Sequence, residues 1–232
     1  MVAGLLELSP QAAATMATLA EDRFFFAVGS GEYLNEHIVG ESWPPPGTRL
    51  GMLAEAIEVI RALWRGAEVD HDGAYFTARR ARLYSLPEVP PPLIVAASGP
   101  DAARLAARVG DGLITTAPDP RVMRAWDEAG GHGPRIGMVH LAYGPSVDVG
   151  KAILVKHWPH APLPETLNAD LETPAQFAAA SMSIRPEDYD ERIPQGPDPA
   201  PVIEAIQKYA ELGCDHVVLH QVGPEQQPFI DW

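Results

Sequence analysis

Cysteine is almost absent from this 232-residue chain, and Cys214 is the only one. The chain can therefore form neither an intramolecular disulfide nor a cysteine-based metal cluster, which fits a reducing cytoplasm. Between Gly213 and Asp215 we expect this thiol to pack as a small buried hydrophobe rather than to act as a nucleophile. No apolar run approaches the about 18 residues of a membrane span, and the first eight residues lack the basic start of an export signal. We therefore expect a cytoplasmic protein that does not cross a membrane.

Basic residues are also scarce, since 17 lysines and arginines stand against 31 aspartates and glutamates, for a formal charge of −14. Nucleic-acid binding is not expected, because no basic cluster interrupts the acidic background. The eight histidines show no H-E-x-x-H or similar spacing, so a metal-dependent hydrolase is disfavoured and we expect no metal site. With 46% hydrophobic residues the chain can bury a core. The composition leaves a globular protein with a small-molecule ligand as the expectation.

The segment 23–28, which is apolar from Phe24 onward, stops abruptly at two glycines and a cluster of polar side chains. The run is too short for a helix and too uniformly apolar for a half-exposed strand, so it predicts a parallel strand buried on both faces. The glycines would let the backbone approach a ligand closely. The candidate site residues that follow this strand are Gly29, Ser30, Gly31, Glu32 and Asn35.

A second buried strand is predicted over Leu93–Ala97, and it leads through Ser98-Gly99-Pro100 into a helix that begins at Asp101. The free backbone N–H groups and the dipole of that helix favour an anion. The same turn is also an ordinary way to start a helix, so by itself it is not specific. A third strand, Gly112–Thr116, ends in hydroxyl side chains.

The rest of the chain continues the alternation of helices and strands. Asp72-Gly73 predicts a two-residue turn in a small hairpin with an exposed His71, and Pro159–Thr173 predicts an insertion loop. Further helices are predicted over 10–20, 50–64, 121–128, 147–158, from 174 onward and over 199–212, and further strands over 136–143 and 216–220. Five strands separated by helices indicate a parallel α/β protein, either an open doubly wound sheet or part of a (β/α)₈ barrel.

Several short motifs occur in an order that resembles the bacterial luciferase-like superfamily, and within it the coenzyme F420-dependent oxidoreductases close to the F420-dependent glucose-6-phosphate dehydrogenases. These motifs are Gly29-Ser30-Gly31-Glu32 with Asn35-Glu36, the helix end 60–66, Asp72-Gly73, Ala96–Pro100 and Gly110-Asp111-Gly112. The resemblance runs from about Ser9 to Phe229. It implies a partial (β/α)₈ TIM barrel of the luciferase-like type with strands four to eight present. The whole chain, 1–232, would be one domain that is truncated at both ends, with 159–197 as an insertion segment.

The resemblance also implies a chemistry, namely hydride transfer between an organic substrate and coenzyme F420, with an FMN-dependent monooxygenase as the alternative on the same scaffold. Ser98-Gly99-Pro100 would contact the phosphate-bearing tail of the cofactor. Glu32 would lie near the reactive ring as the candidate catalytic acid or base if the site buries it, and the alternative is that Glu32 and Asn35 cap the following turn. The full set of implied cofactor contacts is Gly29, Ser30, Gly31, Glu32, Asn35, Ala96, Ala97, Ser98, Gly99, Pro100 and Thr116.

The substrate is expected to differ from that of the best-known relatives. Asp119, roughly Glu191, and Gln227-Pro228 stand where the glucose-6-phosphate enzymes carry basic phosphate ligands. Because each lost charge-assisted contact costs about 1.5–3 kcal/mol, we expect that glucose 6-phosphate is not the substrate. The two open edges of a five-strand arc would invite pairing with a second copy, so we expect a homodimer. A non-catalytic fragment of such a barrel is the remaining alternative.

Overall fold

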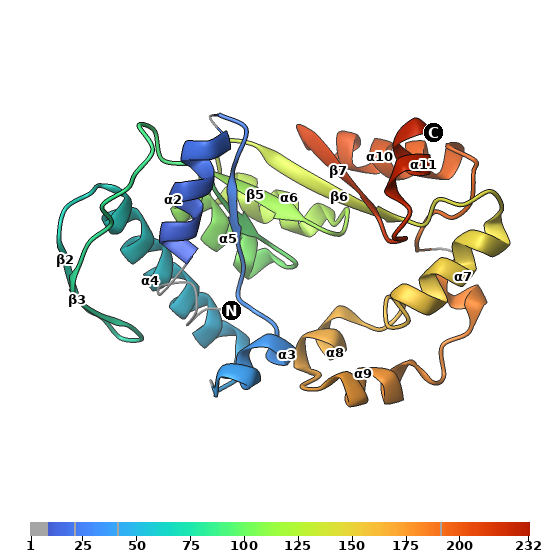
Figure 1. The fold of residues 1–232 in the computed structure, drawn as a ribbon, viewed down its shortest axis with the longest axis horizontal. Helices are drawn as coiled ribbons and strands as arrows, with labels where there is room; N and C mark the ends of the chain where they lie inside the picture. Colours follow the sequence, from blue (N-terminus) through green and yellow to red (C-terminus); the bar gives the residue numbers. More distant parts are fainter. Residues whose placement is uncertain (1–8, 21, 41, 191) are drawn as a thin grey trace. The chain divides into compact units, whose positions relative to one another are not determined.

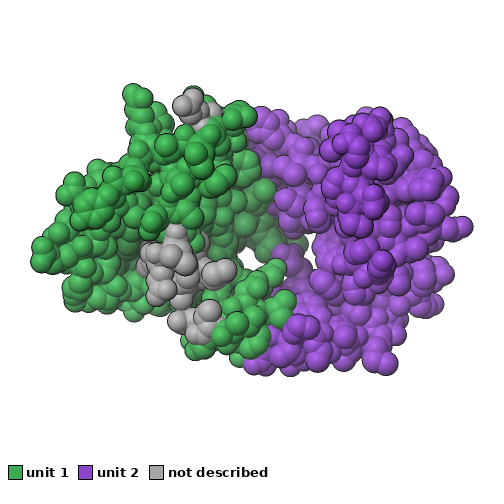
Figure 2. Space-filling model, viewed as in Figure 1, with its two compact units in different colours: residues 1–114, 119–134 green, residues 115–118, 135–232 purple. Residues whose placement is uncertain are grey.

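The computed structural model describes residues 9–20, 22–40, 42–190 and 192–232 (Figure 1). The chain divides into two compact units, which Figure 2 colours separately. Unit 1 comprises residues 1–114 and 119–134, and unit 2 comprises residues 115–118 and 135–232. None of the helices in the described ranges is long and apolar enough to cross a membrane.

Unit 1 is built around three parallel strands in the order β1-β4-β5. Its elements are α2 (Ser9–Ala20), β1 (Phe26–Val28), α3 (Tyr33–Glu36), the 3₁₀ helix η1 (His37–Val39), α4 (Pro46–Trp64), β2 (Val69–Asp72), β3 (Thr77–Ala81), β4 (Leu93–Ala96), α5 (Pro100–Val109), β5 (Gly112–Thr115) and α6 (Pro120–Glu128). Leu93, Ile94 and Val95 of β4 are almost fully buried, because the strand has a neighbour on each side. This continuous apolar run is typical of an inner strand of a parallel sheet.

The carboxylate of Asp111 explains why an acidic residue stands between two glycines just before β5. Its Oδ2 accepts the backbone N–H of Leu93 at 2.8 Å, and its Oδ1 accepts from Arg61 Nη2 of α4, also at 2.8 Å. Arg61 Nη2 also donates to the Val109 carbonyl at 2.9 Å, at the end of α5. One aspartate therefore joins the start of β4 to α4, and the same arginine secures the end of α5.

Unit 2 contains the parallel pair β6 (Arg135–Leu141) and β7 (His216–Gln221), in register from Ile136 opposite His216 to Leu141 opposite Gln221. Its helices are α7 (Val147–His157), α8 (Glu165–Asp170), α9 (Pro174–Ser181), the 3₁₀ helix η2 (Pro186–Tyr189), α10 (Ala200–Glu211) and α11 (Gln226–Asp231). The Tyr209 hydroxyl of α10 donates to the Met138 carbonyl of β6 at 2.9 Å. This partly buried bond holds α10 on the strand pair.

The prediction of a strand over 23–28 buried on both faces was wrong in length and in burial. Only Phe26–Val28 is strand, Ala27 is exposed, and the Phe25 side chain is 41% exposed. Among the described residues β1 pairs with β4 alone, so its other edge lacks the neighbours that double-sided burial needs. Phe26 still finds an aromatic partner, because its ring meets the Trp64 ring of α4 edge to face at 6.0 Å.

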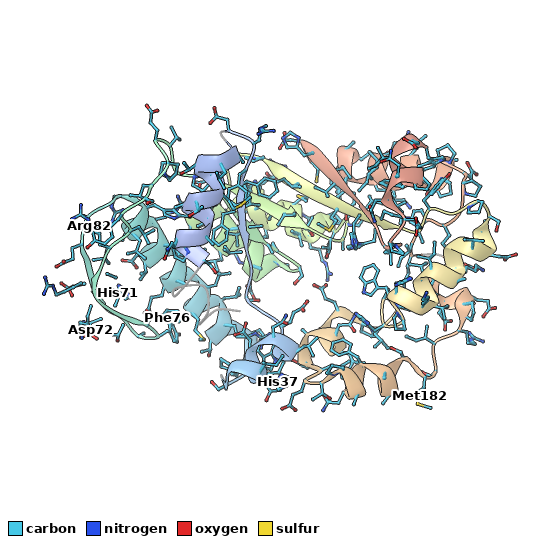
Figure 3. All side chains as sticks on the ribbon, viewed as in Figure 1. His37, His71, Asp72, Phe76, Arg82 and Met182 are labelled. Atoms are coloured by element: carbon cyan, nitrogen blue, oxygen red, sulfur yellow. The ribbon has the colours of Figure 1, made fainter. Side chains whose placement is uncertain are left out.

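The small hairpin is confirmed as β2 and β3, but its turn differs from the prediction. The turn spans Gly73–Phe76, closed by a bond from Gly73 N–H to the Phe76 carbonyl at 3.0 Å, rather than two residues at Asp72-Gly73. His71 is not exposed, because its Nε2 bonds Glu55 of α4 at 3.1 Å (Figure 3 labels His71 and Phe76). A contact from a distant helix therefore covers a side chain that the local pattern left in solvent.

Two further expectations about local structure and one about burial needed correction. The predicted loop Pro159–Thr173 contains the helix α8, and the polar stretch after β1 contains α3. Cys214 is half-buried rather than buried. Burial raises the pKa of its thiol, which agrees with the expectation that it is no nucleophile.

Candidate functional site

The two predicted loops follow their strands at the same edge of the sheet in unit 1. Val28 of β1 lies opposite Val95 of β4 in a parallel pair, so the next residues, Gly29 and Ala96, are neighbours. A Cβ atom added to Gly29 would lie 3.3 Å from the Cβ of Ala96, which is tighter than most real contacts. The structure therefore brings residues 29–35 and 96–100 together, at the strand ends where parallel α/β folds bind ligands.

Gly31 is the turning point of the first loop. Its φ of 83° lies in the left-handed region that favours glycine. Helix α3 begins directly afterwards, and the Glu32 carbonyl accepts the N–H groups of Asn35 and Glu36 at 3.0 and 3.2 Å. A side chain with a Cβ at position 31 would strain this reversal, so the glycine sets where α3 starts.

The structure bears on one of the two roles that the sequence suggested for the Glu32 side chain, the capping of α3. It makes no capping hydrogen bond at α3, so the capping alternative is wrong for this residue. It is exposed, and so is Asn35, whereas acid–base tuning by burial needs an enclosed carboxyl. Its catalytic role stays a prediction.

An aromatic stack after β1 was missed by the sequence reasoning. The Tyr33 and Trp43 rings lie nearly parallel with centroids 5.5 Å apart, and the Arg49 guanidinium sits over the Trp43 ring at 3.7 Å. Arg49 Nη1 also donates to the Pro44 carbonyl at 2.7 Å. The sequence did hold a signal for this stack, because Arg49 stands six residues after Trp43 with three prolines between them. The stack pins the segment that follows the candidate site against the start of α4.

The second loop ends in an N-terminus of α5 that no side chain caps. Gly99 is the N-cap residue with extended backbone, and a Cβ added to it would meet nothing within 4 Å. Ser98 next to it is exposed. Open space in front of an uncapped helix start is an environment that suits an anionic group. The residues present therefore fit the phosphate-bearing tail of a cofactor.

Thr116 directly follows β5 and belongs to unit 2, where its side chain is exposed. The buried hydroxyl is that of the preceding Thr115, which donates to the Ala117 carbonyl at 3.1 Å. A role for Thr116 stays a prediction. In the ranges described, no group of three or more histidine, cysteine, aspartate or glutamate side chains could hold a metal ion.

A shallow groove of about 690 Å³ lies elsewhere in unit 1. Its lining includes Arg108, Val109 and Asp111 at the end of α5, just before β5 begins. Since the candidate loops follow the strands, the groove is at the opposite end of the strands from them. Its Arg61 and Asp111 side chains are already engaged with each other, so we assign it no role.

The family model described as luciferase-like monooxygenase matches residues 9–132. Among curated proteins, the chain is 35% identical over 233 residues to an F420-dependent glucose-6-phosphate dehydrogenase of Beutenbergia cavernae, covering 95% of this chain and 69% of that protein. It is 33% identical to the enzyme of the same name from Nocardia farcinica, covering 95% and 70%. The chain thus spans about 70% of the length of these relatives.

Solved structures agree on the fold. An F420-dependent secondary alcohol dehydrogenase in complex with an F420-acetone adduct superposes with a TM-score of 0.82 at 26% identity, over 94% of this chain and 70% of that one. The coenzyme F420-dependent tetrahydromethanopterin reductase of Methanopyrus kandleri gives 0.71 at 17% identity, over 97% and 76%. These likenesses confirm the predicted partial barrel of the luciferase-like type. The chain belongs to the luciferase-like family, among its coenzyme F420-dependent oxidoreductases.

Proposed function

We propose that this chain binds coenzyme F420 at the ends of β1 and β4 and transfers a hydride between an organic substrate and the deazaflavin. The observation that carries the proposal is the uncapped start of α5 in open space. It lies next to the loop after β1, whose Gly29 packs beside Ala96 of β4. When bound, the deazaflavin supplies the carbon that accepts or donates the hydride. An FMN-dependent monooxygenase is less favoured, because two monooxygenase structures that resemble this chain are only 16% and 17% identical to it and share the fold alone, whereas an F420-dependent relative is 35% identical.

The residues of unit 1 would hold the cofactor through backbone more than through side chains. Ser98 and the backbone N–H groups at the start of α5 would receive the anionic tail, helped by the helix dipole. Gly29 and Gly31 would let the chain lie close to the ring system, since neither carries a Cβ. Glu32 and Asn35 would supply polar contacts beside it.

The substrate is proposed to be a neutral alcohol or carbonyl compound rather than glucose 6-phosphate. The side-chain bond from Arg121 is the main cause that holds the pKa of Asp119 below its ordinary value, so this carboxylate is anionic and engaged, with Oδ2 2.7 Å from Arg121 Nη2. Gln227 Nε2 donates to Asp231 at 2.8 Å, and Glu191 lies outside the described residues. Asp119 and Arg121 neutralise each other as an ion pair, so this position offers an anionic sugar phosphate no free cation, where the resemblance places one.

We also propose that the chain works in the cytoplasm as a homodimer and that residues 159–197 form an insertion within one luciferase-like domain. The single cysteine supports the cytoplasmic location, since a cytoplasmic protein needs no disulfide. The exposed apolar side chains of β7, Val218 and Leu219, support the homodimer, because such a strand gains by pairing with another copy. Light scattering would test the dimer.

Gly99 offers a sharp test of the cofactor site. The Gly99→Asp variant places a carboxylate in front of α5, where the extended backbone accepts any residue and the space is open. Aspartate is a favourable N-cap, so the fold should hold or gain stability while the anionic tail is repelled. We expect F420 affinity to fall at least tenfold, and Gly99→Ala, the matched control, to bind like the wild type.

The readout is a fluorescence or dialysis titration with F420 and, in parallel, with FMN, followed by turnover of secondary alcohols and of glucose 6-phosphate. Saturable binding of FMN but not F420 would favour the monooxygenase alternative. Binding of neither would favour a non-catalytic fragment. Turnover of glucose 6-phosphate in the millimolar range would disprove the substrate proposal.

A further inference from the structure

Strand β7 is an open edge of unit 2. Among the described residues it pairs with β6 alone, and it is the last strand of its sheet (Figure 1). Its Val218 and Leu219 side chains are each 37% exposed, although both are apolar. An open strand edge presents a row of backbone N–H and C=O groups, which is a template for pairing with another strand.

The sequence of β7 lacks the features by which proteins protect such an edge. The strand reads His-Val-Val-Leu-His-Gln, with no proline and no lysine, arginine, aspartate or glutamate. Its register against β6 runs from His216 to Gln221 without a shift, so no bulge turns the edge away. In a chain with a formal charge of −14, this strand is a place where two copies can meet without repulsion between carboxylates.

The histidine beside Leu219 is held inside its own copy. His220 Nδ1 lies 2.8 Å from Nδ1 of His140 on β6, so the two rings share one proton in a hydrogen bond. Burial, followed by repulsion from His220, lowers the pKa of His140 to about 4, so at neutral pH His140 carries no charge. This contact ties β7 to β6 through side chains and leaves the backbone of the opposite edge open.

The ladder between β6 and β7 shows which backbone groups are open. The Val222 N–H donates to the Leu141 carbonyl at 3.0 Å, one residue beyond the last pair, Leu141 with Gln221. The backbone groups of a strand point alternately to its two sides, so the even-numbered residues of β7 face β6. Val217, Leu219 and Gln221 therefore direct their N–H and C=O groups to the open edge.

Two copies of this edge fit each other about a two-fold axis. In an antiparallel pair, opposed residues exchange N–H···O bonds in both directions when both face the partner. An axis at Leu219 opposes Leu219 to the partner subunit's Leu219 and Val217 to the partner subunit's Gln221, so every open residue is bonded. An axis at Val218 would leave Gln221 out.

We propose that β7 pairs antiparallel with β7 of a second copy of this chain, with Leu219 on the two-fold axis. The proposal rests on the homodimer of the proposed function and names its interface. The strand at the other end of the sheet, β1, has only three residues and offers a shorter partner. A contact between β7 and the β1 of a second copy would also be head-to-tail and would leave further edges open.

The sharpest test uses two cysteine variants with the same starting exposure. In Leu219→Cys the two Cα atoms on the axis would lie about 5.5 Å apart, within the range of a disulfide. In Val218→Cys the two positions are displaced along the strands by two residues, roughly 7 Å, which is too far. Under mild oxidation we expect Leu219→Cys to form a disulfide-linked dimer at least tenfold faster, with the wild type, which carries Cys214 alone, as the background.

Amide hydrogen exchange tests the same register without a substitution. The N–H groups of Val217, Leu219 and Gln221 should be protected at high protein concentration and lose that protection on dilution. The N–H groups of Val218 and His220 face β6 and should stay protected at both concentrations.

A charge on the axis gives a third measurement. Leu219→Lys would bring two ammonium groups together on one face, and we expect the dissociation constant of the dimer to rise at least tenfold. The control is Met182→Lys, because Met182 of unit 2 is 87% exposed and lies outside the strand, and it should leave the constant unchanged.

The outcomes separate the interface from the rest of the proposed function. A dimer whose three edge amides exchange freely, or in which Val218→Cys cross-links as fast as Leu219→Cys, overturns this interface alone. Light scattering that shows only monomers overturns the interface and the homodimer together. Coenzyme F420 binding is titrated separately, so its failure leaves the β7 pairing standing.

Discussion

Replacing Glu55 by glutamine should release the hairpin β2–β3 from α4. The Glu55 carboxylate accepts backbone N–H groups of Ala74, Tyr75 and Phe76 at 2.8–3.1 Å and bonds His71 Nε2 at 3.1 Å. Its side chain is only 12% exposed. Four donors converge on one anion, and an amide in its place keeps one acceptor oxygen and turns an NH₂ group toward the donors.

The magnitude follows from which donors water can reach. Ala74 and Tyr75 are exposed, so their N–H groups regain hydrogen bonds to solvent when the carboxylate is lost. Phe76 and His71 are half-buried, and a hydrogen bond to a charged group contributes about 1.5–3 kcal/mol. We therefore expect the hairpin to open more easily by about 1.5–3 kcal/mol, which is roughly a tenfold to hundredfold rise in opening.

Amide hydrogen exchange at Phe76 measures this opening directly, and urea unfolding measures global stability. The matched control is Glu58→Gln, a neighbouring exposed glutamate of α4, which should leave exchange unchanged. Unchanged exchange at Phe76 in Glu55→Gln would refute the reasoning, because the carboxylate would then not be what holds the turn.

The pH dependence has a definite sign. Burial alone would raise the pKa of Glu55, but the bonds from His71, Phe76 and Tyr75 outweigh it and the pKa lies below its ordinary 4.5. A lowered folded-state pKa means that the stabilisation is complete above the unfolded value and is lost as pH falls through the folded value. Protection of Phe76 should therefore hold at pH 5–7 and decline only below 4.5.

Two further pairs of substitutions, each a test with its control, examine the loops and their support. Gly31→Ala and Gly40→Ala both force a side chain into left-handed backbone, at φ 83° and 80°, and each should lose about 1–2 kcal/mol in urea unfolding. Only Gly31→Ala should also weaken F420 binding, so equal affinities for the two variants would argue against the site. Asp111→Asn should destabilise unit 1 by about 1.5–3 kcal/mol, because it removes the charge that accepts hydrogen bonds from Arg61 and from Leu93 N–H. The control is Asp101→Asn, which should cost less than about 1 kcal/mol because Asp101 forms an exposed pair with Arg104. Similar losses for both aspartates would contradict the bracing role of Asp111.

Local patterns were sufficient wherever the neighbours of a segment are implied by the segment itself. The run Leu93–Val95 predicts an inner strand because a stretch without polar side chains must be covered on both faces, and β4 is so covered. The helix stripe from Leu50 to Trp64 predicts α4 in the same way. The order of the strands along the chain also sufficed to place the loops after β1 and β4 as a candidate site, because parallel strands end on one side.

The tertiary structure decided everything that depends on residues far apart in the chain. Phe25 is exposed because β1 has one strand neighbour among the described residues, and His71 is covered because Glu55 reaches it from α4. His140 and His220 are 80 residues apart, and only the register of β6 against β7 makes them partners. Sequence periodicity reports which face of an element is apolar, whereas burial of a carboxyl or the sharing of a proton is set by which other element packs there.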